Sequence, residues 1–368
     1  MGTVNIAVEG CCHGQLDDIY RCITRHEASG NPKVDILLIC GDFECVRDLN
    51  DLNCLAVPQK YRKLNTFHQY VTGEKVAPVL TVFVGGNHEA SNILQELYYG
   101  GWVAPNIYFL GFAGSIRFGG LRISGVSGIY NGRHYQCGHF EYPPYSEDTK
   151  RSIYHTRELE IFRLSHLPKN ETDIMLSHDW PSGIWEHGDR QALLRKKPFF
   201  KDDIASGRLG SPPLMQTLVH LKPRWWFAAH LHTKFAATVR HAPAAVTNIT
   251  RAPTTLPALP LESPTPSALT SCPAGQPPPP PGPPPMSTLP TAGADSSPCT
   301  HFLALDKILP RRQFMEFISI PTDAGQHAPH ELTFDCEWLA ILKKSHSLLS
   351  TSRGRVSLPP SGTLDPSA

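Results

Sequence analysis

The stretch Val4-Asn5-Ile6-Ala7-Val8-Glu9-Gly10-Cys11-Cys12-His13 decides the fold, because an apolar run leads directly into two metal-ligand side chains. The same order recurs further along the chain: apolar runs at 35–39, 79–84, 173–177 and 225–229 precede Asp42, Asn87 with His88, His178, and His230 with His232. Short apolar runs are typical of strands buried on both faces, and ligands collect at the carboxyl ends of such strands. The sequence therefore predicts a ligand site at one edge of a sheet.

Helical patterns alternate with the predicted strands. An amphipathic stretch runs from Gln15 to about Ala28, and further helical stretches cover 50–70 and 93–97. This alternation predicts an α/β fold of layered β-sheets flanked by helices. We expect additional strands at 121–126, within 223–238 and at 302–306, and a helix at 337–342, as read from the apolar patterns there.

Composition limits the possible settings of this fold. The chain has 368 residues, is 40% hydrophobic and carries a formal net charge of +1, so contacts with a nucleic acid would need local basic patches. No long apolar run lies near the N-terminus, and we expect an intracellular protein without a membrane span. The ten cysteines are then expected to be reduced thiols.

Residues 241–300 differ from the rest in being dominated by Pro, Ala, Thr and Ser. Such a segment cannot bury enough apolar surface to offset its ordering entropy, so we expect a disordered insertion. Its polyproline run at 277–285 could bind a partner module. The alternatives are a tolerated surface insertion or a translated intron.

The candidate ligands form two sets of four around a shared carboxylate. One set contains Cys11, His13, Asp42 and His232, and the other contains Asp42, Asn87, His178 and His230. A carboxylate has two oxygens and can bridge two cations, so the sequence predicts a dinuclear metal site at strand ends. Two cations about 3.5 to 4 Å apart polarise a phosphoryl group and generate a hydroxide nucleophile, which suits phosphoester hydrolysis.

Two residues in this set have an alternative interpretation. His88 is adjacent to a ligand without being one, so it is a candidate general acid, although it could instead support a ligand by a hydrogen bond. Cys11 is a candidate thiolate ligand, although it could be a buried structural thiol beside Cys12.

The motifs Gly41-Asp42, Gly86-Asn87-His88-Glu89, Ser177-His178-Asp179 and Ala229-His230-Leu231-His232 resemble those of the calcineurin-like metallophosphoesterases. A closer resemblance is to the RNA lariat debranching enzymes, carried by Gly10 to Gly14, Gly85 to Asn92, Gly101 to Tyr108 and Ser177 to Pro181. It implies a catalytic domain at 1–240 and a C-terminal debranching domain at 301–345. We expect this C-terminal domain to pack on the core, and the polar, proline-containing tail at 346–368 to be flexible.

The resemblance also implies an activity. The expected reaction is hydrolysis of the 2′-5′ phosphodiester at the branch point of excised intron lariat RNA after splicing, with nuclear residence inferred from that substrate. His88 would protonate the leaving 2′ oxygen. Cys11 stands where the wider superfamily has aspartate, and a thiolate favours softer cations. The expected cofactors are divalent metals, one or two per site, and these are Fe(II), Zn(II) or Mn(II).

Residues 128–158 combine aromatic and basic side chains, a pattern used to stack on unpaired bases and pair with phosphates. In the debranching family the corresponding stretch is a lariat recognition loop. The candidate substrate-binding residues are Tyr130, Arg133, His134, Tyr135, His139, Phe140, Tyr142, Lys150, Arg151 and Tyr154. The alternative is a surface insertion whose aromatic side chains pack on the domain.

Two other functions stay open on the sequence. One is a metallophosphoesterase that acts on a different phosphoester and has no need of an aromatic and basic loop. The other is a non-catalytic scaffold with the same fold, although such scaffolds usually lose ligands.

Overall fold

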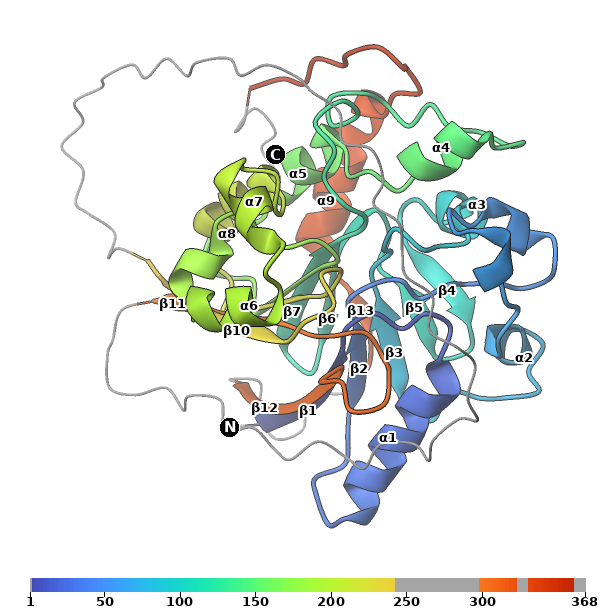
Figure 1. The fold of residues 1–368 in the computed structure, drawn as a ribbon, viewed down its shortest axis with the longest axis vertical. Helices are drawn as coiled ribbons and strands as arrows, with labels where there is room; N and C mark the ends of the chain where they lie inside the picture. Colours follow the sequence, from blue (N-terminus) through green and yellow to red (C-terminus); the bar gives the residue numbers. More distant parts are fainter. Residues whose placement is uncertain (1, 242–297, 323–329, 361–368) are drawn as a thin grey trace.

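The computed structural model describes residues 2–241, 298–322 and 330–360. Two β-sheets pack face to face and helices cover their outer faces (Figure 1), which confirms the expected layered α/β fold. None of the helices in these residues is long and apolar enough to cross a membrane.

The first sheet is mainly parallel and contains the N-terminal strand. Its strand order is β12-β1-β2-β3-β5-β4. Strands β1, β2, β3 and β5 are parallel, whereas β12 and β4 are antiparallel edge strands. The bounds are β1 (Gly2–Glu9), β2 (Ile36–Ile39), β3 (Leu80–Phe83), β4 (Gly101–Ala104), β5 (Ile107–Phe109) and β12 (Met315–Thr322).

The second sheet has the order β10-β11-β9-β8-β7-β6-β13, and its strands β7, β8, β9 and β11 are parallel. Its strands are β6 (Ala113–Phe118), β7 (Leu121–Val126), β8 (Ile174–Ser177), β9 (Trp225–Ala228), β10 (Phe235–Arg240), β11 (Cys299–Ala304) and β13 (Thr333–Phe334). The predicted strand region 223–238 is therefore two strands joined by a turn that carries His230 and His232.

The inner core lies between the sheets. Val4, Ile6 and Val8 of β1 face this core, while Ala7 faces the helices on the other side. This period of two is the alternation of a strand with both faces covered. Tight packing on both faces fixes the strand ends in register, and these ends carry the candidate ligands.

Helices cover the outer faces. The first sheet is covered by α1 (Leu16–Ala28), α2 (Phe67–Val71) and α3 (Ser91–Glu96). The second sheet is covered by α5 (Glu158–Leu164), α6 (Arg190–Lys196), α7 (Phe200–Ala205), α8 (Pro212–Leu221) and α9 (Cys336–Ser345). Helix α4 (Glu147–Ser152) lies within the 128–158 loop, and the short 3₁₀ turns are η1 (Asp51–Cys54), η2 (Gln59–Tyr61), η3 (Ile184–His187) and η4 (His346–Leu348).

The helix predictions had mixed outcomes. The helix expected from Gln15 to about Ala28 is confirmed as α1. The helical stretch expected over 50–70 is wrong as a continuous element, because the structure has η1, η2 and α2 separated by extended chain. Pro58 lies in the middle of this stretch and has no backbone N–H to continue a helix.

Two boundaries also need correction. Residues 242–297, with the polyproline run 277–285, lie outside the described residues. The 241–300 boundary is wrong at its end, because β11 begins at Cys299 and pairs with β9 and β10.

The tail over 346–368, expected to be flexible, makes backbone contacts within 346–360, and its flexibility stays a prediction. Gly138 N donates to Ser352 O at 2.8 Å, and Val356 N donates to Gln136 O at 2.7 Å. These backbone bonds tie the tail to the 128–158 loop. The remaining residues, 361–368, lie outside the described residues.

Candidate metal centre

The candidate ligands follow parallel strands of both sheets. Those from the first sheet come after β1, β2 and β3, and those from the second come after β8 and β9. Because the carboxyl ends of parallel strands share one edge, the two facing sheets bring these turns together. The site therefore exists only where the two sheets meet.

The first set of four side chains is a close cluster. Ligand atoms of Cys11, His13, Asp42 and His232 all lie within 4.8 Å of one another. His13 Nδ1 lies 3.3 Å from Glu44 Oε1, so that nitrogen has a partner. His13 Nε2 faces Asp42 Oδ2 at 3.5 Å, and both atoms are buried without a hydrogen-bond partner among the described residues. A cation between these two orphaned atoms would satisfy both.

The second set repeats this geometry on the other oxygen of Asp42. His178 Nδ1 donates to Cys40 O at 2.7 Å, and burial lowers the pKa of His178, so the ring is neutral. Its Nε2 lone pair then faces Asp42 Oδ1 at 3.3 Å and Asn87 Oδ1 at 3.1 Å. Three lone-pair-bearing atoms converge here, which fits a second cation. His230 lies beside them, with its ring centroid 5.0 Å from that of His178.

Asp42 holds the two sets together. Burial acts to raise its pKa, but His178, His88 and His13 lower it far more, so the pKa lies well below the usual range and the carboxylate is ionised. Oδ1 also accepts a 2.9 Å hydrogen bond from His88 N. Asp42 is the residue whose geometry suits a bridge between two cations.

The two imidazoles from β9 are kept neutral. Burial lowers the pKa of His230 to about 4. Burial, followed by the charge of Lys307, lowers that of His232 to about 3. Neutral imidazole is the form that binds metal. His230 N also donates to Cys11 Sγ at 3.2 Å, which links the two sets directly.

The backbone at the ligands is unusual. His13, Asp42, His230 and His232 have φ angles of 45°, 50°, 62° and 48°, in the left-handed region. Non-glycine residues in this region are strained and persist only where their surroundings fix them, commonly at functional sites. The tight turns point consecutive side chains into the site from short loops.

Two glycines make room for this arrangement. Gly41 has a φ of +113°, and a Cβ there would come 2.3 Å from His178 Nδ1. A Cβ on Gly86 would come 2.2 Å from Asp42 Oδ1. Any larger residue at either position would displace a candidate ligand.

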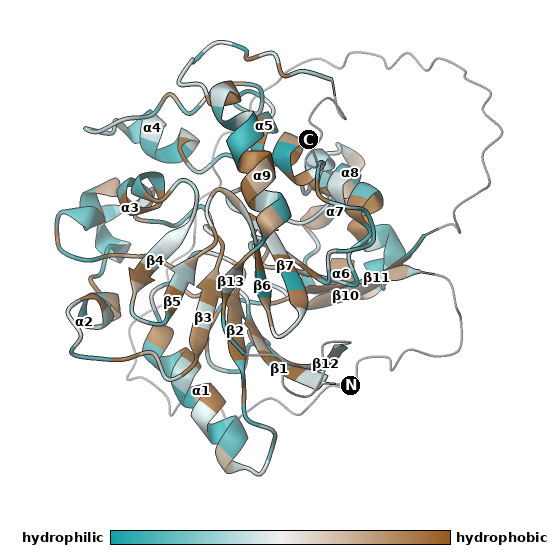
Figure 2. Cartoon of the chain, turned by 180° about the vertical axis from the view of Figure 1, so that it is seen from behind, coloured by the Kyte–Doolittle hydropathy of each residue, from teal (hydrophilic) through white to brown (hydrophobic). Residues whose placement is uncertain are grey.

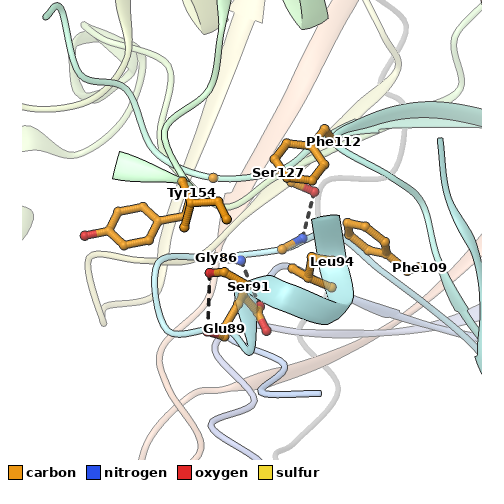
Figure 3. A pocket seen from close by; sticks show the side chains of 11 residues that line it. Gly86, Glu89, Ser91, Leu94, Phe109, Phe112, Ser127 and Tyr154 are labelled. Carbon is orange, nitrogen blue, oxygen red and sulfur yellow. Dashed lines mark hydrogen bonds between the residues drawn. The ribbon is translucent and has the colours of Figure 1, made fainter. Parts of the chain in front are cut away.

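Glu89 joins two ligand loops. Its Oε1 accepts from Phe43 N and Gly86 N at 2.8 and 2.9 Å, and its Oε2 accepts from Glu44 N at 2.8 Å. Figure 3 shows Glu89 beside Gly86, in the small pocket that Ser91 and Ser127 also line. Burial, followed by the charge of Asp42, raises the pKa of Glu89 to about 8. This role of Glu89 could not be predicted from the sequence, because it depends on contacts with a loop 46 residues away.

His88 lies at the rim of the cluster. Its ring centroid is 5.4 Å from that of His13, and its Nδ1 is buried without a hydrogen-bond partner among the described residues. A ring nitrogen held beside the ligands and not engaged elsewhere is available to a bound substrate.

Lys307 was also missed by the sequence analysis. It follows β11, and Cys11 pairs with it in an isolated bridge. Its charge acts to lower the pKa of both His13 and His232. The signal was present, since the apolar run 302–306 leads into this lysine just as the other runs lead into ligands.

The 128–158 loop starts at the metal centre. Tyr130 N donates to Asp179 Oδ2 at 3.1 Å, directly after His178. Tyr154 lines the pocket behind Gly86 and Glu89. These two candidate substrate-binding residues therefore contact residues that directly follow or precede metal-ligand positions.

Other candidates in this loop face inward. His134 Nδ1 lies 2.8 Å from His155 Nδ1, and His139 Nε2 lies 2.9 Å from Glu160 Oε1. Tyr135 packs on the core of the second sheet. The guanidinium groups of Arg157 and Arg353 lie 5.5 and 5.4 Å from the centre of the Phe140 ring.

The remaining candidates lie at the surface of the loop. Tyr142 is 75% exposed, and Arg133 and Arg151 are also exposed. Lys150 is half-buried and pairs with Glu147 at 2.7 Å. The structure thus separates a packed interior of the loop from an outer face of aromatic and basic residues.

Two family models match the chain. The model described as calcineurin-like phosphoesterase matches residues 4–234. The model described as lariat debranching enzyme, C-terminal domain, matches residues 297–367.

Similar curated proteins carry one name. The chain is 50% identical over 97% of its length to a lariat debranching enzyme of Drosophila pseudoobscura pseudoobscura, of which it covers 63%. It is 44% identical over 99% of its length to that of Arabidopsis thaliana, covering 74%, and 46% identical over 95% to that of Homo sapiens, covering 55%. The chain thus spans between about half and three quarters of the length of these relatives. It belongs to the calcineurin-like phosphoesterases and, within them, to the lariat debranching enzyme family.

Proposed function

We propose that this protein hydrolyses the 2′-5′ phosphodiester at the branch point of excised intron lariat RNA, so that the linearised intron can be degraded after splicing. One observation carries the proposal: each oxygen of Asp42 faces the Nε2 of a different histidine, His13 or His178, whose Nδ1 already has a partner. Such a carboxylate is built to bridge two cations.

The metal ligands in this proposal are Cys11, His13, Asp42 and His232 for one cation, and Asp42, Asn87, His178 and His230 for the other. When bound, the cations would polarise the phosphoryl oxygens and activate the attacking water. Burial raises the pKa of the Cys11 thiol, so the thiolate depends on a bound cation of the softer kind. We therefore favour Fe(II), Zn(II) or Mn(II), with one or two cations per site.

His88 is the proposed general acid. It follows the ligand Asn87, Asp42 Oδ1 accepts a hydrogen bond from its backbone N–H, and its Nδ1 has no hydrogen-bond partner within residues 2–241, 298–322 and 330–360. The imidazolium would give its proton to the leaving 2′ oxygen of the branch nucleotide. Lys307, which follows β11 and pairs with Cys11 at the same sheet edge, would add positive charge beside the phosphate.

The 128–158 loop would bind the RNA around the branch. Tyr130 and Tyr154 lie beside the metal centre. Tyr142, Arg133 and Arg151 are exposed on the outer face of the loop. We propose that the inward-facing His134, Tyr135, His139 and Phe140 shape the loop instead of contacting RNA.

Nuclear residence follows from the proposed substrate and is part of the proposal. A partner module that binds the polyproline run at 277–285 is a further proposal, and this run lies outside the described residues.

The deciding experiment is single-turnover cleavage of a synthetic 2′-5′ branched RNA by metal-reconstituted protein and by His88→Ala. A linear 3′-5′ RNA and an aryl phosphate serve as substrate controls. His187→Ala is the control for the loss of a histidine. His187 is exposed and lies near His241, which follows β10, whereas the turn with His230 and His232 precedes β10.

We expect branch cleavage by the unaltered protein, survival of the linear RNA, and a loss of about 100-fold or more in His88→Ala alone. Cleavage of the aryl phosphate without the branch would instead indicate another phosphoesterase. Full metal occupancy without any cleavage would indicate a scaffold.

A further inference from the structure

Residues 58–63 form a basic and aromatic surface beside the metal centre. The segment contains Lys60, Tyr61, Arg62 and Lys63, and Lys60, Tyr61 and Lys63 are exposed. Tyr61 is 50% exposed, and Lys60 Nζ lies 4.9 Å from the centre of its ring. We call Lys60, Tyr61 and Lys63 the 60–63 surface.

One end of this segment adjoins a metal-ligand turn. A Cβ on Gly14, which follows His13, would come 2.2 Å from Asn65 Nδ2. Asn65 is two residues after Lys63 and has a left-handed φ of 51°. The residues that directly follow the 60–63 surface therefore contact the turn that carries His13.

The other end adjoins α4 of the 128–158 loop. Helix α3 contacts this loop, because Gln95 Nε2 donates to Glu141 O at 2.6 Å. Asn92 Nδ2 of α3 donates to Asp51 Oδ1 of η1 at 2.6 Å, and both views show α4 next to α3 (Figures 1 and 2). The 60–63 surface thus bridges the metal centre and the outer face of the recognition loop.

The charges on this surface are available. In the part of the chain that the structure describes, no salt bridge involves Lys60 or Lys63. Arg62 differs, because its Nε donates to Val57 O at 3.0 Å and so shapes the turn. Exposed cations beside an exposed aromatic ring suit a nucleic acid strand, with phosphates on the cations and a base on the ring.

We propose that the 60–63 surface binds one single-stranded RNA arm as it leaves the branch point, with Lys60 and Lys63 on backbone phosphates and Tyr61 stacked on a base. The surface continues the outer face of the recognition loop, where Tyr142 and Arg151 are exposed. This inference rests on the proposed function, since it concerns the arms of the same substrate.

The test compares two branched RNAs, one with arms of about eight nucleotides and one trimmed to about one nucleotide per arm. The variants are Lys60→Gln/Lys63→Gln and Tyr61→Ala. The matched control is Lys33→Gln/Lys169→Gln, because both lysines are exposed and lie just before β2 and β8, at the strand ends away from the ligands.

For the long-armed RNA we expect KM to rise about five- to tenfold in the lysine variant with kcat little changed. A plot of log(kcat/KM) against the logarithm of the salt concentration has a negative slope, and this slope should become less steep by about 1.4 in the lysine variant. That is the value for two lost single-strand phosphate contacts. Tyr61→Ala should raise KM by at least about fivefold without changing the salt slope. The trimmed RNA cannot reach the surface and should show the same kinetics in every variant.

The outcomes separate the two proposals. If the unaltered protein cleaves neither RNA, the proposed function fails. If it cleaves both, and the lysine variant behaves like the control, the 60–63 surface is not an RNA site. An equal loss on both RNAs would also overturn the inference, because it would show a general effect on the metal centre.

Discussion

Asp335 accepts a 2.7 Å hydrogen bond from Arg122 Nε, although 213 residues separate them in the chain. Both side chains are buried, and Asp335 also accepts from Ser115 Oγ at 2.7 Å. The same carboxylate caps the N-terminus of α9 through Glu337 N. The contact fixes the C-terminal region to the second sheet.

Asp335→Ala should therefore destabilise the protein by about 3 to 5 kcal/mol, because it removes the buried carboxylate that pairs with the buried Arg122. The other carboxylates that pair with Arg122, those of Glu171 and Glu337, are 56% and 44% exposed. Urea unfolding at neutral pH measures the loss. Asp189→Ala removes an exposed helix cap on α6 and should cost only about 1 kcal/mol. Equal losses in the two variants would mean that Asp335 acts as a cap only.

Glu89→Gln should weaken metal binding. The amide nitrogen of the glutamine is a donor, and it would face a backbone N–H of Phe43, Glu44 or Gly86, which is also a donor. At least one hydrogen bond would be lost, and the loops that carry Asp42 and Asn87 would separate. We expect about a 10- to 100-fold loss of metal affinity in chelator competition. Glu96→Gln, an exposed carboxylate on α3, is the control, and equal affinities in the two variants would contradict the prediction.

Glu160 should make stability depend on pH. Burial acts to raise its pKa, but His139, Tyr98 and Arg163 lower it to about 2 from an ordinary value of 4.5. A carboxyl group whose folded-state pKa is depressed stabilises the fold above its unfolded pKa and loses that contribution as pH falls. The contribution of Glu160 is therefore complete above about pH 4.5 and declines towards pH 2.

Glu160→Gln should lower the free energy of unfolding by about 3 kcal/mol at pH 7, and the difference from the unaltered protein should shrink below pH 4.5. Urea unfolding at several pH values measures it. Glu158→Gln, on the same helix turn but partly exposed, should change the free energy of unfolding at pH 7 only slightly. A difference for Glu160→Gln that stayed constant down to pH 3 would refute the assignment.

Removal of 242–297 should leave branch cleavage largely intact. Arg240 and Cys299 are register partners in the pair β10 and β11, so a short linker can replace the segment without moving either strand. Shortening a loop from roughly sixty residues to a dozen changes closure entropy by only about 1 to 2 kcal/mol. Single-turnover kinetics and soluble yield are the measurements, and a collapse of either would show that the segment is needed.

The ligands could be predicted from the sequence because each is local to a strand. His178 and His230, for example, directly follow apolar runs, and the sheet edge that unites them follows from parallel pairing. Partners such as Arg122 and Asp335 could not be predicted, because no short pattern records a contact between distant residues.

In the recognition loop, too, contacts between distant residues could not be predicted from the sequence. Its composition predicts an RNA-binding element, but composition does not separate His139, which pairs with the buried Glu160, from the exposed Arg151. Lys60 and Lys63 were not selected because their short basic run gains meaning only beside Gly14 and α4. Lys307 was missed although its local pattern matched that of the ligands.

The pairing of β1 with β12 has a consequence for synthesis. Val4 lies opposite Ile320, so one edge of β1 stays open during synthesis until almost all of the described chain that follows it has been made. An open edge of a flat apolar strand is a template for pairing with another chain. We therefore expect chaperones to bind β1 while the chain is being synthesised. A chain that ends before Met315 should aggregate, because it lacks β12.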